Sequence, residues 1–246
     1  MQVNISLVPE RRRGPELMDL PPETYSQAEL SGSLADIRAV NRYLGDTKTT
    51  LRLLEALTGA APRPAGATLR VLDVATGSAD IPVAIARWAE GRGVKAAVTA
   101  VDVNPLAVRE AERLTAGYPE ISLAVADGFR LPFADGSFDI VTCVKALHHF
   151  TEEETVRILR EMDRVSSVGI IAMDLRRSSV AWALIWLLTR LFTRNRLTRF
   201  DGPMSVLRSY TVSELDTLGE GAGVPGLRVF RAPLWRIALV GHKGNT

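Results

Sequence analysis

Three aspartates stand at or beside short apolar runs between residues 71 and 127 of this 246-residue sequence. Asp73 lies inside the first run, Asp102 ends the second run 25 positions after Gly77, and Asp127 follows the third. An acid at the end of the second strand of an α/β sheet can accept hydrogen bonds from both hydroxyls of a ribose. A carboxylate after the third strand could accept from the amino group of an adenine. Together these acids predict a pocket for a ligand that contains adenine and ribose.

The segment around Asp73 predicts a strand, a tight turn and a helix. VLDV at 71–74 is a short apolar run followed by a turn, as in a strand that is buried on both faces. Small residues fill the turn at 75–79, and 81–88 is apolar at helical spacing. Asp80 is expected at or near the helix N-cap. This arrangement brings bare backbone and a helix N-terminus close to a ligand.

The residues of the turn indicate which adenine-containing ligand the pocket would bind, a dinucleotide or S-adenosylmethionine. A dinucleotide site prefers three glycines, so that a pyrophosphate can sit on the helix end, but this turn has only Gly77, with Ala75 and Ala79 beside it. A pyrophosphate would be repelled by Asp73 and Asp80, whereas an amino group and a sulfonium would be attracted. The residues therefore indicate S-adenosylmethionine rather than a nicotinamide cofactor. The two alanines are acceptable only if their φ stays negative, and a positive φ would weaken or displace cofactor binding.

Two adjacent histidines, His148 and His149, follow the fourth apolar run at 138–143. Either is a candidate base for an acceptor O–H, a role that accelerates reactions by about 10²–10⁴-fold. The alternative is a structural helix start in which both imidazoles bond to backbone. Neighbouring histidines point to different sides, so at most one is expected to face an acceptor. The pair lacks the i, i+4 spacing of a helical metal site, and we expect no metal.

The remaining sequence predicts the elements that position these residues. From residue 70 onward, strand-like runs alternate with helical stretches, which indicates crossover units and a parallel sheet. Runs at 228–231 and 236–240 have hairpin spacing. We expect an α/β fold with a Rossmann-like doubly wound sheet of seven strands. The sheet is expected to be mostly parallel with an antiparallel C-terminal edge strand, and an N-terminal helical cap is expected beside it.

The chain divides into two expected parts. Residues 1–62 form an N-terminal arm and helical lid, and residues 63–246 form the ligand-binding domain. The arm, which extends to about residue 22 and contains three consecutive arginines, is expected to be solvated. Ser31 or Ser33 is expected to cap the first lid helix and Asp46 the second.

Three residues near the end of the first lid helix could face a ligand: Asn41, Arg42 and Tyr43. The alternative is that Tyr43 is a packing residue and Arg42 is solvated.

Residues 174–211 are predicted to be an acceptor-side helical insertion. Their helix is unusually apolar and has arginines at both ends, and Trp182 and Trp186 are candidates to line a lid over an aromatic or lipid-like acceptor. Arg208 and Tyr210 follow as further substrate-binding candidates. A core or dimer helix is one alternative, and a membrane-surface helix is a less favoured one.

Composition excludes several classes of protein. The formal net charge of +2 gives no support for nucleic acid as the main partner. The single cysteine rules out an internal disulfide and argues against a cysteine-rich metal site. There is no apolar signal core at the N-terminus and no apolar run of about 18 residues. We therefore expect a cytoplasmic protein, either a monomer or a homodimer.

Four motifs together resemble the class I S-adenosylmethionine-dependent methyltransferases: VLDVATGSADIP, VTAVDVNP, VADGFRLPFADGSFDIVTC and KALHHF. They look most like the branch that includes the ubiquinone and menaquinone biosynthesis methyltransferases. The resemblance implies that the methionine part is surrounded by Asp73, Ala75, Gly77 and Asp80, with Lys145 closing over it. It also implies that Asp102 binds the ribose, and that the adenine lies against Val103, Asp127, Gly128 and Phe129.

The sequence thus predicts a metal-independent methyltransferase that uses S-adenosylmethionine and releases S-adenosylhomocysteine. The methyl group is expected to go to an oxygen, or a carbon, of a small hydrophobic or aromatic acceptor such as a phenol, a quinol precursor or a polyketide-like product. The Asn/Asp-Pro-Pro-aromatic element of nucleic-acid base methyltransferases is missing after 138–143. One alternative is a protein of the same fold that binds S-adenosylmethionine but catalyses a non-methylating reaction such as a cyclisation. The other is a non-enzymatic interaction protein.

Overall fold

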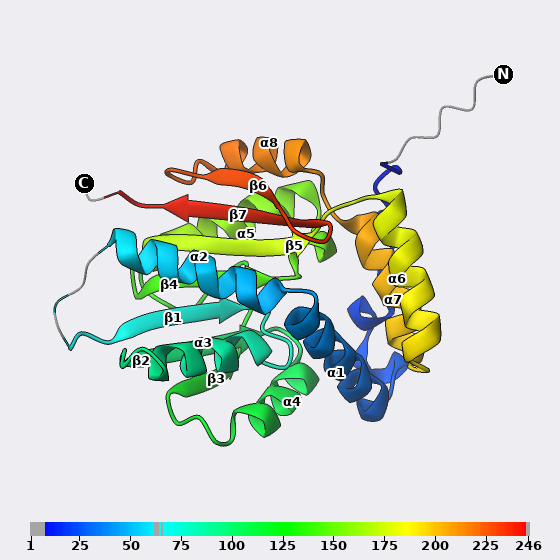
Figure 1. The fold of residues 1–246 in the computed structure, drawn as a ribbon, viewed down its shortest axis with the longest axis horizontal. Coiled ribbons are helices and arrows are strands. Elements are labelled where there is room, and N and C mark those ends of the chain that lie inside the picture. The colour runs from blue at the N-terminus through cyan, green and yellow to red at the C-terminus, as the bar shows by residue number, and fades with distance from the viewer. Residues whose placement is uncertain (1–7, 62–63, 65, 245–246) are drawn as a thin grey trace.

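A computed structural model describes residues 8–61, 64 and 66–244, and shows one seven-stranded sheet in the order β3-β2-β1-β4-β5-β7-β6 (Figure 1). The strands are β1 (Leu69–Val74), β2 (Ala96–Asp102), β3 (Ile121–Val125), β4 (Phe138–Val144), β5 (Ser166–Leu175), β6 (Arg228–Ala232) and β7 (Arg236–His242). All seven predicted strands are present, within a few residues of their expected ends.

The sheet is parallel from β3 to β5 and antiparallel at its C-terminal end, as predicted. β7 runs antiparallel to both β5 and β6, and β6 lies outside it at the edge. The strand order reverses between β1 and β4. In doubly wound sheets the crevice at such a reversal, beyond the carboxyl ends of the strands, is where ligands bind.

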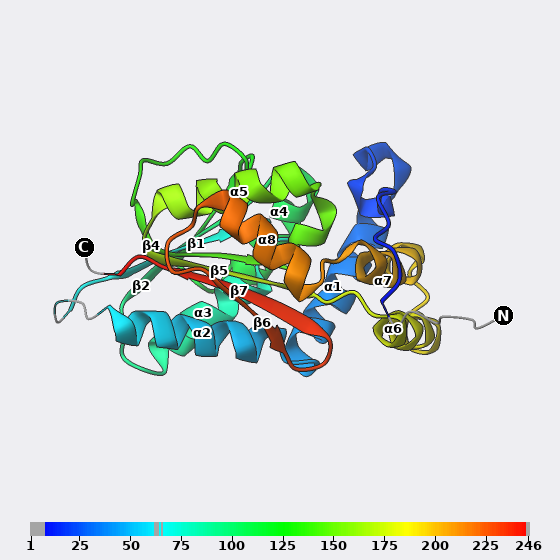
Figure 2. The same ribbon diagram turned by 90° about the horizontal axis from the view of Figure 1, so that it is seen from above.

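Helices cover both faces of the sheet (Figure 2). α2 (Asp46–Ala60) and α3 (Asp80–Glu90) pack on one face, where Leu54 and Ile85 are fully buried. α5 (Glu152–Val165) and α8 (Val212–Ala222) pack on the other. α4 (Pro105–Thr115) lies against β3, β2 and α3.

A cap of helices stands at the end of the sheet toward which β1 points (Figure 1). It consists of α1 (Gln27–Tyr43), α6 (Ser179–Phe192) and α7 (Arg196–Arg208), with the short helices η1 (Leu17–Asp19) and η2 (Pro22–Thr24). A third short helix, η3 (Leu147–His149), follows β4. No helix in the described part of the chain is long and apolar enough to cross a bilayer.

Two predicted helix caps are wrong. α1 begins earlier, at Gln27, after the N-cap Ser26, whose side chain accepts from the Glu29 N–H in a reciprocal capping box. Ser31 and Ser33, the predicted caps, lie inside the helix. α2 is capped by the backbone of Gly45, whose φ is +90°. Asp46 is the first helical residue, because its carboxylate is used by a distant partner, Arg236.

The described part of the N-terminal arm is solvated in part: residues 12–15 are exposed, but Arg11 and Glu16 pack against the rest of the protein. Arg11 lies 3.8 Å above the Tyr210 ring and donates to the carbonyl of Arg208. The Arg12 N–H donates to the carbonyl of Leu207, whereas the side chain of Arg13 is 77% exposed. Residues 1–7, and the predicted domain boundary at 62 and 63, lie outside the described residues. The division into two parts therefore stays a prediction.

Candidate active site

The strand-end acids gather at the carboxyl edge of β1, β2 and β3, which are neighbours in the sheet. Asp73 is 2% exposed, and its two oxygens accept hydrogen bonds from the hydroxyls of Thr76 at 2.7 Å and Thr142 at 2.5 Å. Burial raises the pKa of Asp73 to about 7. This carboxyl group is therefore held in place, and it has no ion pair with any residue that the structure describes.

Asp102 joins two loops at this edge. One oxygen accepts from the Gly77 N–H at 2.8 Å, and the other accepts from the Asn104 N–H at 2.9 Å. Burial raises the pKa of Asp102. Asn104 in turn caps α4 and donates to the Tyr25 hydroxyl at 3.1 Å. Asp102 thus fixes the turn after β1 against the loop after β2, where the ribose is expected.

The two alanines of the turn have positive φ, contrary to the condition set from the sequence. Ala75 has φ +55° and Ala79 has φ +60°, and Gly77 between them has φ +56°. Three left-handed residues fold the backbone tightly between β1 and α3. A left-handed alanine costs about 1–2 kcal/mol, because its Cβ crowds the following carbonyl oxygen. Ala79 also serves as the backbone N-cap of α3, so Asp80 is the first helical residue instead of the cap.

Ala75→Gly is expected to stabilise the protein by about 0.5–1 kcal/mol, because relief of the left-handed strain outweighs the added freedom of the unfolded chain. Ala84→Gly, in the interior of α3, is the matched control and should destabilise by about 1 kcal/mol. Thermal unfolding of both variants checks the pair. A loss of stability in Ala75→Gly equal to that in Ala84→Gly would contradict the positive φ.

Asp80 and Asn41 place side-chain oxygens that can accept hydrogen bonds beside one another at the start of α3. The Asn41 Nδ2 group donates to Asp80 Oδ2 at 2.9 Å, while Asn41 Oδ1 is buried without a hydrogen-bond partner among the described residues. Burial raises the pKa of Asp80. A buried acceptor that lacks a donor is costly. With Asp73 close enough to interact with Asp80, the set fits the ammonium and sulfonium charges of S-adenosylmethionine.

The predicted adenine side is open. Val103 is 69% exposed, and Asp127 is exposed with one oxygen accepting from the Phe129 N–H at 2.9 Å. A Cβ on Gly128 would lie only 2.9 Å from Val74 Cγ1, so a larger residue would displace this loop. These residues form the far end of the same strand edge.

Lys145 is held beneath the site by an ion pair. Its ammonium lies 3.1 Å from Asp46, whose two oxygens also accept from Nε and Nη2 of Arg236, each at 2.9 Å. Burial lowers the pKa of Lys145, and the charge of Asp46 opposes that effect. Lys145 has φ +59°. Its predicted contact with the methionine part stays a prediction.

His148 forms a buried pair with Asp174 at the end of β5. His148 Nδ1 lies 2.7 Å from Asp174 Oδ1, and the His148 N–H donates to the other oxygen at 2.8 Å. Burial favours the neutral acid, but the charge and hydrogen bonds of His148 outweigh it and hold the pKa of Asp174 below its usual range. Because a carboxylate only accepts, Nδ1 carries a proton, and Nε2 is the nitrogen that could exchange a proton with an acceptor. No sequence pattern was used to predict this partner, although β4 and β5 end side by side.

His149 belongs to a separate ion network. Its Nδ1 lies 2.5 Å from Asp19, and Nε2 lies 3.9 Å from the buried Glu16. Burial lowers the pKa of His149, but Glu16 and Asp19 have the larger effect and raise that pKa to about 9. The Arg208 guanidinium donates hydrogen bonds to Asp19 and to the backbone carbonyls of His148 and His149. A protonated His149 cannot accept a proton, so the base assignment favours His148.

Glu16, His148 and His149 hold potential metal-ligand atoms within 4.8 Å of one another. Other groups of the protein already contact this cluster. Glu16 accepts from the Ser205 hydroxyl at 2.9 Å, and the guanidinium of Arg208 lies 4.0 Å away, where it would repel a cation. The prediction that the site uses no metal stays a prediction.

The predicted substrate residues do not form one group. Arg42 and Tyr43 are exposed, and so are Trp182 and Trp186 on α6. Tyr210 is buried, with its hydroxyl bonded to Thr155 and to the Phe150 carbonyl. Of the six predicted substrate residues, all of which the structure describes, Arg208 is the one with hydrogen bonds to His148 and His149. The residues missed by sequence reasoning are Asp174, Glu16 and Asp19; the last two lie in the arm, where no pattern marked them.

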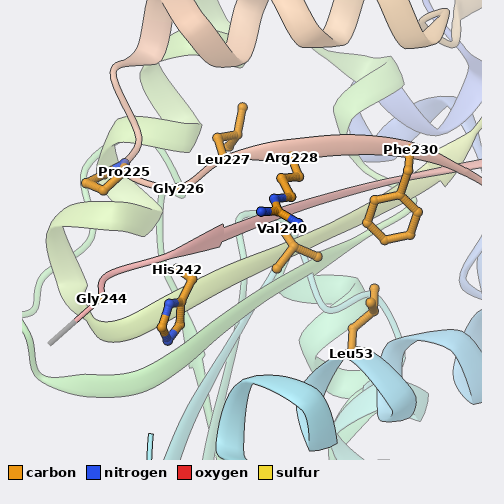
Figure 3. Close-up of a pocket in the computed structure, with 9 residues that line it drawn as sticks. All are labelled: Leu53, Pro225, Gly226, Leu227, Arg228, Phe230, Val240, His242 and Gly244. Carbon is orange, nitrogen blue, oxygen red and sulfur yellow. The ribbon is translucent and has the colours of Figure 1, made fainter. Parts of the chain in front are cut away.

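A cleft of about 670 Å³ lies elsewhere, over β6 and β7 (Figure 3). Leu53, Phe230 and His242 are among its lining residues. His242 pairs with Gly169 in the amino-terminal half of β5, so the cleft extends toward the opposite edge of the sheet from the acids. It is not part of the candidate site.

Comparison with known proteins yields a family match over the central part of the chain. Residues 71–169 match a family described as a methyltransferase domain. Ajmaline N-methyltransferase of Rauvolfia serpentina is 31% identical over 72 residues, which is 28% of this chain. That match spans only 24% of the plant protein's length.

Solved structures share the fold at low identity. An S-adenosylmethionine-dependent methyltransferase from Aquifex aeolicus superposes with a TM-score of 0.60 at 17% identity, covering 88% of this chain and 98% of that one. Human N-acetylserotonin methyltransferase in complex with S-adenosylmethionine superposes with a TM-score of 0.61 at 17% identity. The overlap covers 93% of this chain and 61% of the human protein.

Proposed function

We propose that this chain, whose residues 71–169 match a methyltransferase domain and whose fold is that of class I S-adenosylmethionine-dependent methyltransferases, methylates a small-molecule acceptor. The observation that carries the proposal is the set of acceptors at the carboxyl edge of β1 and β2. Asp73, Asp80 and the unpartnered Asn41 Oδ1 suit a cation, and Asp102 suits a ribose.

S-adenosylmethionine supplies a methyl group on a positively charged sulfur, which is an excellent leaving group. The protein has to hold the acceptor in line with that methyl, and such positioning can contribute about 7–11 kcal/mol. Asp73 and Asp80 would attract the ammonium and sulfonium of S-adenosylmethionine. Asp102 would accept from the ribose, and Asp127 would accept from the adenine. These assignments rest on the chemistry of the side chains.

The acceptor nucleophile is proposed to be an O–H group whose proton passes to His148 Nε2. Asp174 supports this role by holding the tautomer and by stabilising the charged imidazolium. Nε2 lies 3.5 Å from Glu16, which is longer than a hydrogen bond. The curated relative is named as an N-methyltransferase, so amines belong in the same test as phenols and quinols.

The test is methyl transfer from radiolabelled S-adenosylmethionine to a panel of phenols, quinols, catechols and aromatic amines. The proposal expects labelled product together with S-adenosylhomocysteine in equal amounts. Tight binding of the cofactor without any labelled product would favour a non-methylating reaction on the same fold. Absence of cofactor binding would favour a non-enzymatic interaction protein.

Cofactor binding is also expected to release a proton from Asp73. Its folded pKa of about 7 lies above the ordinary value of 3.8, so its neutral form stabilises the ligand-free protein below pH 3.8. That stabilisation is lost as the pH rises through about 7. A bound cation lowers the pKa again, so binding near pH 6 should expel up to one proton.

Titration calorimetry in buffers of different ionisation enthalpy measures this proton. The release should be largest near pH 6, vanish above about pH 8, and disappear in Asp73→Asn. A release that persists in Asp73→Asn would assign the proton to another group.

A further inference from the structure

The apolar helix α6 faces outward instead of into the core. Only Ala181 and Thr189 of its 14 residues are buried. Leu191 is 65% exposed and Phe192 is 80% exposed. The other exposed large apolar residues of the helix are Val180, Trp182, Leu184, Trp186, Leu187 and Leu188. An exposed apolar surface of this kind marks an interaction site.

Figures 1 and 2 place α6 at the outer end of the molecule, with its inner side against α7. The outer side is turned away from the sheet. The acceptor lid predicted for Trp182 and Trp186 stays a prediction.

Arginines border this apolar surface. A groove of about 450 Å³ between α6 and α7 is lined by Trp182, Trp186, Arg190, Arg194, Arg196, Arg199, Phe200, Pro203, Met204 and Leu207. The Arg199 Nε atom is buried without a hydrogen-bond partner among the described residues. Arg190 stacks 4.5 Å from the Trp186 ring. Arg196 pairs with Glu29, but Arg194 has no ion pair with any described residue.

The charge of this segment has one sign. Residues 175–200 contain six arginines and no aspartate, glutamate or lysine. The nearest acid on α7, Asp201, is 4% exposed and accepts from the N–H groups of Leu17 and Met18. A partner therefore has to be apolar where α6 is apolar and anionic where the arginines lie.

We propose that α6 and the α6–α7 groove dock on the surface of an anionic lipid bilayer. Tryptophan and leucine on one face with arginines beside them are typical of helices that lie in the membrane interface. The arginines would meet lipid phosphates, and Arg199 would gain the acceptor that it lacks. A second copy of the chain fits less well, because a two-fold contact through this face would bring the arginine groups together. The inference does not depend on the reaction that the site catalyses.

The experiment is cosedimentation of the full chain with vesicles of phosphatidylglycerol and phosphatidylcholine, against vesicles of phosphatidylcholine alone. Binding should be at least about 10-fold stronger to the anionic vesicles and should weaken as salt rises. The tryptophan emission should shift to the blue on binding.

Two variants separate the parts of the surface. Arg194→Gln with Arg199→Gln should weaken binding to anionic vesicles by about 10-fold or more, and Leu191→Ser with Phe192→Ser should weaken it similarly. The matched controls are Arg109→Gln on α4 and Phe230→Ser on β6, which lie on other surfaces and should bind like the wild type. Circular dichroism verifies that every variant is folded.

Equal binding to both vesicle types, or no binding, would overturn the proposal. So would a dimer in sedimentation equilibrium that Leu191→Ser with Phe192→Ser dissociates, because this face would then belong to a second copy. Binding of free phosphate without vesicle binding would restrict the groove to small anions and would also overturn the docking.

Discussion

Replacement of His148 by glutamine is expected to lower kcat for methyl transfer to a hydroxyl acceptor by about 10²–10⁴-fold, with little change in the affinity for S-adenosylmethionine. The reason is the pair that His148 forms with Asp174. With Nδ1 donating to Asp174 at 2.7 Å, Nε2 is the nitrogen that would take the acceptor proton. Glutamine keeps a neutral polar group in this buried position but cannot act as a base.

Two comparisons make the His148 result specific. Asp174→Asn should lower kcat and shift the pH profile, because the imidazolium loses the charge that stabilises it. His149→Gln should cost much less, since the pKa of His149, about 9, keeps it protonated near neutral pH. Single-turnover rates with the acceptor found in the labelled-methyl panel measure all three. Loss of activity in His149→Gln but not in His148→Gln would reverse the assignment.

Asp102→Ala is expected to weaken S-adenosylmethionine binding by at least about 100-fold. Each hydrogen bond to a charged group contributes about 1.5–3 kcal/mol, and a ribose offers two hydroxyls to this carboxylate. The substitution also frees the N–H groups of Gly77 and Asn104, so the turn after β1 loses its anchor. Calorimetric titration with the cofactor and with S-adenosylhomocysteine measures the change.

Asp139→Ala is the matched control for Asp102→Ala. Asp139 also lies on a strand and also accepts from a backbone N–H, that of Arg70, but it lies near the start of β4. It is therefore at the opposite edge of the sheet, and its loss should leave cofactor affinity unchanged. Equal effects of the two substitutions would show general destabilisation instead of a ribose contact.

Much of the fold follows from local sequence patterns. The run 71–74 and the runs that follow are short, apolar and bounded by turn residues, so their strand character is encoded within a few residues. The alternation of strands with helices then leaves few topologies, because crossover connections are right-handed. In parallel strands the carboxyl ends share one edge, which is why strand order and residue type suffice to group Asp73, Asp102 and Asp127.

Local patterns failed where a distant partner competes for the same side chain. Asp46 has the residue type and position of an N-cap, yet it is bonded to Arg236, 190 positions away. The arm has the composition of a solvated segment, but Arg11 bonds residues beyond position 149. In both cases the local pattern predicts that a charged side chain caps its own helix or faces solvent. In the protein that side chain is bonded to a residue far away in the sequence.

The sequence by itself determined the order of elements, the sheet edge that carries the acids and the kind of cofactor those acids suit. Only the tertiary structure decided that Asp174 orients His148, that Asn41 Oδ1 finds no hydrogen-bond partner among the described residues, and that α6 is exposed. The physical reason is range. Strand and helix character depends on residues within one or two turns, whereas Asn41 meets Asp80 across 39 positions and His148 meets Asp174 across 26. An apolar helix has the same periodic pattern whether a core, a second copy or a bilayer covers it, so its surroundings are decided by how the chain packs.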